Sequence, residues 1–133
     1  MVLKLTVPMA SSNSFAALRS FTDDLVGKLA VTQKIANKVN VVIDEIYSNI
    51  ANYSGADTAE IEYEISGGKL VLTFTDNGVE YNPLDTKEPD ITLCAEDRKI
   101  GGLGIFMVKK MTESMEYTYE GGKNILKLVI GLG

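Results

Sequence analysis

Apolar side chains recur at every third or fourth position through two stretches in the first half of the chain. This spacing places an apolar stripe along one side of a helix, so it predicts amphipathic helices over about 13–30 and from Thr32 to about Ser54. Thr32 is a good N-cap residue, and Gly55 is a favourable residue at the end of a helix. The apolar positions are Phe15, Leu18, Phe21, Leu25 and Leu29 in the first stretch and Ile35, Val39, Val42, Ile46 and Ile50 in the second.

The period changes to two after the second predicted helix. Residues 60–65 and 70–75 alternate apolar and polar side chains around the turn Ser66-Gly67-Gly68, which predicts a β-hairpin with one apolar and one acidic face. We interpret the glutamates on the acidic face as a solvated surface and not as a metal site. The other predicted strands cover 2–7, 115–119 and 125–130.

A short apolar helix is predicted over 105–111, after a segment in which the pattern fades. From Val79 to Lys99 charges are frequent and two prolines interrupt the chain, which is typical of a functional lid or binding loop. The predicted order is strand, helix, helix, hairpin, long loop, helix, hairpin. This order indicates an α+β fold, a two-layer α/β sandwich in which helices cover one face of a mixed, mostly antiparallel sheet.

Composition narrows the chemistry that the chain can perform. With 133 residues and a net charge of −5, we expect a single domain, residues 1–133, that does not bind nucleic acid directly. The absence of histidine excludes Ser-His-Asp and Cys-His sites, imidazole metal sites and self-phosphorylation on histidine. Cys94 is the only cysteine, which excludes an internal disulfide and a multi-cysteine zinc site. Acid–base chemistry therefore requires a carboxylate.

We also expect neither a membrane span nor an export signal in this sequence. No apolar run approaches the ~20 residues that cross a bilayer, and the first residues alternate like a strand instead of forming a signal peptide. We expect a cytoplasmic protein with no membrane association.

Three short motifs carry candidate chemistry. Glu45 and Asn49 are four residues apart, so they share one helix face; a solvated face is the alternative. Asp76 follows a predicted strand, where it could accept a hydrogen bond from an exocyclic amine, and Gly78 leaves room for a flat ring; a plain turn is the alternative. Gly102-Leu103-Gly104 opens a helix, where backbone N–H groups can approach an anion; a flexible hinge is the alternative.

Taken together and in this order, the motifs resemble the N, G1 and G2 boxes of the GHKL ATPase/kinase superfamily. The resemblance covers the whole chain and implies the Bergerat ATP-binding fold. Within the superfamily, the chain is most similar to the stand-alone bacterial anti-sigma factor/serine-protein kinase group of partner-switching systems. Residues 96–100, which lead into the glycines, and residues 121–126 near the end are typical of that group.

The resemblance implies a binding site for ATP and Mg²⁺. Glu45 would be the catalytic general base that takes the proton from a serine hydroxyl. Asn49 would contact the nucleotide by holding Mg²⁺ at the phosphates, since this cation prefers oxygen ligands. Asp76 would accept a hydrogen bond from the adenine amine, and Gly78 would lie at the edge of the ring.

The same resemblance implies how the rest of the nucleotide is held. Gly102, Leu103 and Gly104 would meet the phosphates through the backbone, and the 84–100 segment would be the ATP lid. Arg98, within that lid, would offer a fork of donors to phosphate or to a bound partner.

Three positions depart from the pattern of the group. Tyr53 stands where histidine is frequent, Tyr81 where phenylalanine is usual, and Lys127 where a threonine is common in the last hairpin. Tyr53 and Lys127 are the departures that could weaken or alter nucleotide contacts. None of the three removes a motif residue, so we expect ATP binding to survive.

The group that the chain resembles acts by partner switching. The resemblance implies a Mg-requiring serine/threonine-protein kinase that binds a sigma factor and phosphorylates a STAS-type anti-anti-sigma protein on serine. It also implies a homodimer, with the N-terminal strand and first helix in the dimer and sigma-binding region. Two alternatives remain open: an ATP-gated module that sequesters a partner without phosphorylating it, and a histidine-kinase catalytic domain detached from its histidine domain.

Overall fold

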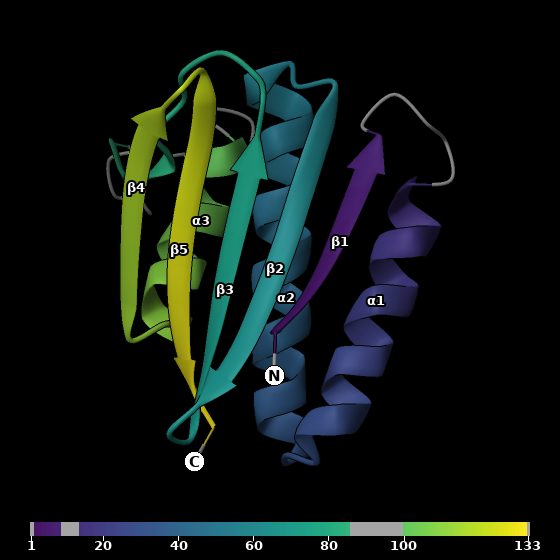
Figure 1. The fold of residues 1–133 in the computed structure, drawn as a ribbon. Helices are drawn as coiled ribbons and strands as arrows, with labels where there is room; N and C mark the ends of the chain where they lie inside the picture. The colour runs from purple at the N-terminus through teal and green to yellow at the C-terminus, as the bar shows by residue number, and fades with distance from the viewer. Residues whose placement is uncertain (1, 9–13, 86–99, 133) are drawn as a thin grey trace.

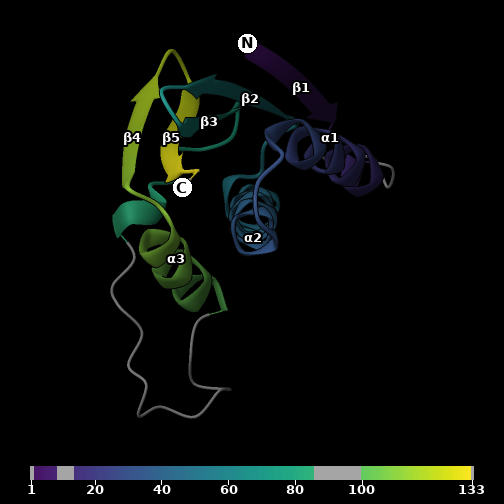
Figure 2. The ribbon, with the colours of Figure 1, turned by 90° about the horizontal axis from the view of Figure 1, so that it is seen from below.

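The computed structural model describes residues 2–8, 14–85 and 100–132, which form two layers (Figure 1). One layer is a β-sheet, and the other is made of helices that all lie on one face of it (Figure 2). The predicted α+β two-layer sandwich is therefore confirmed.

Five strands of the described chain form one sheet in the order β1-β2-β3-β5-β4. All four pairings between neighbouring strands are antiparallel, so among the described residues the sheet has no parallel pair of the kind expected in a mixed sheet. β2 with β3 and β4 with β5 are the two predicted hairpins. The strands are β1 (Val2–Pro8), β2 (Thr58–Ser66), β3 (Lys69–Asp76), β4 (Ser114–Glu120) and β5 (Lys123–Gly131).

The helices begin and end largely where the apolar stripes predict. Thr32 caps α2, with its hydroxyl oxygen accepting a hydrogen bond from the backbone N–H of Ile35 at 3.4 Å. The continuation of α2 as η1 ends at Gly55, whose φ of 65° suits glycine. The elements are α1 (Ser14–Leu29), α2 (Gln33–Asn49), the π-helical turn η1 (Ile50–Ser54), the 3-10 turn η2 (Pro83–Asp85) and α3 (Ile100–Met111).

Two further points concern these helices. α3 begins at Ile100 instead of Ile105, so the glycine-rich segment lies within the helix and does not precede it. Among the residues that the structure describes, no helix is both long enough and apolar enough to span a bilayer.

The core lies between the sheet and the helices. Alternate side chains of β2 and β3 are buried, and the apolar stripe of α2 packs against them. The glutamates of β2 alternate with these buried positions. The Nζ atom of Lys4 on β1 lies 3.6 Å from Oε1 of Glu60 and 3.9 Å from Oε1 of Glu62. The side chains of Glu60 and Glu62 are 37% and 39% exposed, so this row lies at the surface of the sheet.

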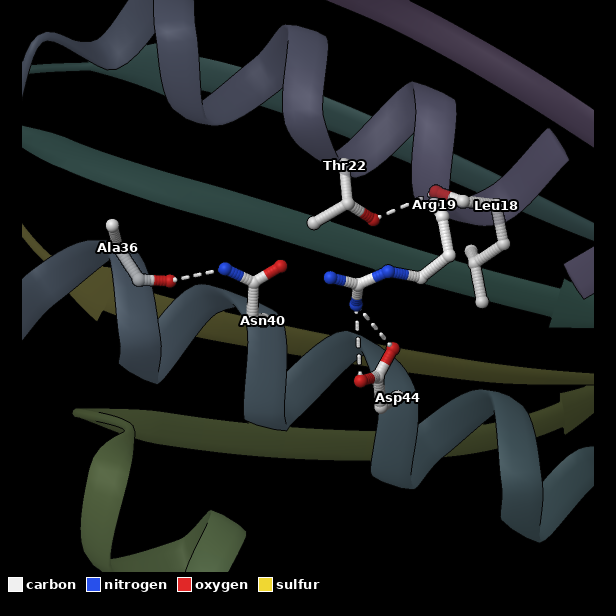
Figure 3. Close-up of polar contacts among 6 residues, drawn as sticks. All are labelled: Leu18, Arg19, Thr22, Ala36, Asn40 and Asp44. Atoms are coloured by element: carbon white, nitrogen blue, oxygen red, sulfur yellow. Dashed lines mark hydrogen bonds and ion pairs between the residues drawn. The ribbon is translucent and has the colours of Figure 1, made fainter. Parts of the chain in front are cut away.

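α1 is joined to α2 by a polar contact (Figure 3). One guanidinium nitrogen of Arg19 donates to both carboxylate oxygens of Asp44 at 3.1 Å. Both side chains are more than a third exposed, so this ion pair contributes no more than about 1 kcal/mol to stability. The contact does fix the direction of Asp44, which points toward α1. Asp44 is the residue directly before Glu45 in the chain.

Replacing Tyr63 by phenylalanine is expected to stabilise the fold. The ring of Tyr63 is fully buried against Phe21, with ring centroids 5.5 Å apart, but its hydroxyl has no hydrogen-bond partner among the described residues. Removing an unpaired buried hydroxyl should raise the free energy of unfolding by about 1 kcal/mol. Urea denaturation measures the change, with Tyr117→Phe as the control, because Tyr117 loses a hydrogen bond and should lose stability. A less stable Tyr63→Phe variant would contradict the prediction.

Candidate functional site

The C-terminal half of α2 presents Glu45 and Asn49 on successive turns. Glu45 is partly exposed, whereas Asn49 is only 4% exposed at the end of the helix. The amide nitrogen of Asn49 is buried and has no hydrogen-bond partner among the described residues. A buried unpaired donor costs free energy unless a ligand accepts its hydrogen bond, so this amide is a place where a ligand would be favoured.

Asp76 lies at the end of β3 and is 5% exposed. Its Oδ1 accepts a hydrogen bond from the backbone N–H of Gly78 at 2.9 Å and another from the Asn124 side chain at 3.0 Å. The strand register places Asn124 of β5 directly opposite Asp76. A buried carboxylate is thus held in one orientation by a turn and by the neighbouring strand.

Asn49 and Asp76 line the same hollow, which lies between the sheet and α2. The hollow opens to solvent, and its empty space, with the open mouth included, is about 330 Å³. Asn49, Asp76 and Asn124 are among its polar lining residues, and apolar side chains such as Ile46 and Phe74 form other parts of its wall. Apolar walls with a few placed polar groups fit a flat heterocyclic ring.

Gly78 lies where the chain leaves β3 and passes close to η1. A Cβ atom at Gly78 would fall 2.7 Å from the Ser54 hydroxyl oxygen and closer still to the Ser54 carbonyl oxygen. The next residue, Val79, donates its backbone N–H to that carbonyl at 2.8 Å. Glycine is required here because two backbone segments approach each other, and this contact forms one side of the hollow, where Ser54 lies.

α3 brings the glycine-rich segment against α2. A Cβ atom at Gly104 would fall 3.0 Å from one carboxylate oxygen of Glu45 and closer to the other. Gly102 and Leu103 lie in the first turn of α3, where backbone N–H groups have no acceptor within the helix and the dipole favours an anion. Arg98 and most of the predicted lid lie outside the described residues.

Tyr117 of β4 also lines the hollow, and its hydroxyl donates to the Oδ1 atom of Asn124. Burial raises the pKa of Tyr117 above its ordinary value of 10.0, and the nearby Glu80 and Asp76 act in the same direction against a hydrogen bond with the Tyr81 backbone. The hydroxyl therefore keeps its proton at neutral pH and remains a donor.

The departures from the family pattern fall into two groups. The rings of Tyr53 and Tyr81 stack on each other with centroids 5.3 Å apart, so these two substitutions are in contact. Lys127 is exposed and lies opposite Thr73, away from the hollow. The β5 residue that reaches Asp76 is Asn124.

Sequence reasoning missed Asn124 and Tyr117. Asn124 occurs in the segment 121–126, whose likeness to the anti-sigma group is visible in the sequence, but nothing local marks its side chain as part of a site. Only the register of β3, β5 and β4 brings the side chains of Asp76, Asn124 and Tyr117 together.

Comparison with known proteins identifies the family. Residues 9–130 match the profile of the histidine kinase-like ATPase domain. The serine-protein kinases RsbW of Listeria monocytogenes (strain HCC23) and Listeria innocua are each 23% identical over 92% of this chain and 84% of their own length. RsbW of Halalkalibacterium halodurans is 21% identical over 90% of this chain and 77% of its length.

Two solved structures share the fold. The RsbU and RsbW domains of Rv1364c from Mycobacterium tuberculosis align with a TM-score of 0.67 and 11% identity over 99% of this chain; the chain spans about a third, 32%, of that structure. The Acinetobacter baumannii histidine kinase AdeS aligns with a TM-score of 0.57 and 15% identity over all of this chain and 69% of its own. The chain belongs to the histidine kinase-like, GHKL-type ATPase domain family and is a distant homologue of the RsbW serine-protein kinases.

Proposed function

We propose that this protein is an ATP-dependent serine-protein kinase that also acts as an anti-sigma factor. Its substrate would be a STAS-type anti-anti-sigma protein, and it would bind its sigma factor as a homodimer. The observation that carries the proposal is the hollow that both Asn49 and Asp76 line, within a family whose members are ATPase domains. The distant RsbW relatives are named serine-protein kinases, which supports serine as the acceptor.

In this proposal the hollow holds the adenine end of ATP, and residues beside it hold the phosphates. Asp76 offers a carboxylate oxygen to the adenine amine, and the apolar side chains cover the faces of the ring. The buried amide of Asn49 would lie toward the phosphates, and Gly102 and Leu103 would offer backbone N–H groups to them. Arg98 would add donors from the lid.

The same residues fit Mg²⁺ only in combination with the nucleotide. No group of histidine, cysteine or acidic side chains that could hold a metal ion is found among the described residues. The carbonyl oxygen of Asn49 would therefore be the protein ligand, and phosphates and waters the others. When bound, Mg²⁺ would neutralise charge that develops on the phosphates.

Glu45 would act as the general base. It would accept the proton of the serine hydroxyl as the serine oxygen bonds to the γ-phosphorus and the bond to the ADP oxygen breaks. The carboxylate lies one helical turn before Asn49 and against Gly104 of α3, so α2 and α3 together determine its position. A positioned base of this kind contributes about 10²–10⁴ to the rate.

Incubation with Mg-ATP and a cognate STAS-domain protein tests the proposal. Phosphoserine on the STAS protein, detected by mass spectrometry, is the expected result. A protein that binds ATP and the STAS partner but forms no phosphoserine would contradict the kinase assignment. Phosphate on a histidine of the partner would instead indicate a histidine-kinase catalytic domain.

Gly104→Ala is expected to reduce phosphotransfer more than it reduces stability. The added methyl group takes the place of the Glu45 carboxylate, and this flexible side-chain end can move aside. Displacing a base by about 1 Å can cost roughly 10²-fold in rate, whereas the change in unfolding free energy should stay within about 1 kcal/mol. Phosphoserine formation and urea denaturation measure the two effects.

The matched control for Gly104→Ala is Gly27→Ala. Gly27 lies in α1, and a methyl group there meets no atom within 4 Å. This variant should phosphorylate at the wild-type rate. An unchanged rate in Gly104→Ala would show that the contact with Glu45 does not position the base.

A further inference from the structure

The side chain of Asn124 makes four hydrogen bonds at one end of the hollow. Its amide nitrogen donates to Asp76 Oδ1 at 3.0 Å and to the carbonyl oxygen of Val79 at 2.7 Å. Its oxygen accepts from the backbone N–H of Tyr81 at 2.9 Å and from the hydroxyl of Tyr117. Two of these partners are backbone groups that can act only as acceptor or only as donor, so the amide has a single possible orientation.

This network makes the two oxygens of Asp76 inequivalent. Oδ1 accepts two hydrogen bonds from the protein, one from Gly78 and one from Asn124. Among the described residues, no hydrogen bond ends at Oδ2, although Asp76 lines the hollow. An acceptor with no donor of its own favours a ligand N–H group and disfavours a ligand carbonyl.

Asn124 also connects three elements around that carboxylate. It lies on β5, it reaches the segment after β3 at Val79 and Tyr81, and it receives the Tyr117 hydroxyl from β4. Asn124 is 4% exposed, so water can replace few of these contacts. Loss of the side chain would free the Asp76 carboxylate to rotate and would leave buried groups unpaired.

We propose that Asn124 is a positioning residue for nucleobase selection: by holding Oδ1 of Asp76, it presents Oδ2 to the exocyclic amine of adenine. Tyr117 supports Asn124 in this role by donating to its oxygen. The inference rests on the proposed function, since it assumes that the hollow takes the base of ATP. It extends that function by assigning selectivity for a 6-amino purine to a side chain outside the three motifs.

The test compares two nucleotides that differ only in the amine. Purine riboside triphosphate is ATP without its exocyclic amine. The dissociation constant of purine riboside triphosphate divided by that of ATP therefore measures how strongly the protein recognises the amine. Calorimetry with Mg²⁺ present should give a wild-type preference for ATP. In Asn124→Ala we expect that preference to fall about tenfold, the scale of one hydrogen bond to a charged group.

Two further variants separate selection from stability. Asn77→Ala is the matched control: its oxygen also accepts two backbone hydrogen bonds, from Asp57 at 2.9 Å and Thr58 at 3.1 Å, but it does not line the hollow. It should keep the wild-type ratio. Tyr117→Phe removes only the supporting hydroxyl and should lower the ratio roughly threefold, which keeps the inference testable if Asn124→Ala fails to fold.

The outcomes are distinct. A wild-type protein that binds neither nucleotide would overturn both the proposed function and this inference. A wild-type protein that prefers ATP, together with an unchanged ratio in Asn124→Ala or in Tyr117→Phe, would overturn the inference alone. A weaker preference for ATP in both Asn124→Ala and Tyr117→Phe, with an unchanged preference in Asn77→Ala, would establish the inference.

Discussion

Glu45→Gln should lower serine phosphorylation by about 10²–10⁴-fold while ATP still binds with near wild-type affinity. Glutamine keeps the size of the side chain but cannot accept the serine proton as a carboxylate does. Glu45 does not line the hollow that would hold the adenine ring, so nucleotide affinity should depend little on Glu45. Phosphoserine formation with the STAS partner measures the first effect, and calorimetry with ATP measures the second.

Asp44→Asn provides the control for Glu45→Gln, because the two carboxylates are adjacent in the chain and differ in direction. Asp44 points to Arg19 on α1, as Figure 3 shows, whereas Glu45 lies against Gly104 on α3. Asp44→Asn should therefore phosphorylate at close to the wild-type rate. Equal losses in both variants would indicate a general effect of charge on α2 and not a general base.

The Glu45→Gln variant also separates the kinase from a module that only sequesters its partner. If the variant still regulates a sigma factor in cells without forming phosphoserine, binding carries the regulation. If regulation is lost together with phosphotransfer, the chemistry is required for release of the sigma factor.

The fold could be predicted from the sequence wherever burial follows a regular period. The stripe of α2 is a clear case, since Val39, Val42 and Ile46 are buried at the spacing that a helix imposes. The start of α3 could not be predicted in this way. Glycine has a low helix propensity, so the glycine-rich segment suggests a loop, but in the structure it is helical and lets α3 approach α2 closely at Glu45.

The candidate site could be predicted only in part, for a similar reason. Glu45 with Asn49 and Asp76 with Gly78 are close in sequence, so their spacing alone suggests shared sites. Asn124 forms its bond to Asp76 across a separation of 48 residues, which only the sheet register determines. The same holds for Gly78: the sequence suggests a space for a ring, whereas the structure adds a contact with η1 that no local pattern contains.

Gly78→Ala should destabilise the fold by about 2–4 kcal/mol, the largest stability change expected here. The added methyl group would meet the carbonyl oxygen of Ser54, which is backbone and cannot rotate away as a side chain could. Relief requires that the segment after β3 move off η1, which would break the 2.8 Å hydrogen bond from Val79 to Ser54. Urea denaturation measures the loss, and ATP affinity should fall with it because Ser54 and Asp76 both line the hollow.

Gly27→Ala separates this steric effect from the general consequence of replacing glycine. The chemical change is the same, but the methyl group at Gly27 meets no atom within 4 Å and the residue is helical. Alanine should therefore raise the free energy of unfolding by about 0.5–1 kcal/mol at that position. A Gly78→Ala variant as stable as wild type would mean that the segment after β3 is not held against η1 in solution. In that case the side of the hollow at Ser54 would be adjustable, and tight ATP binding would depend on the ligand to order it.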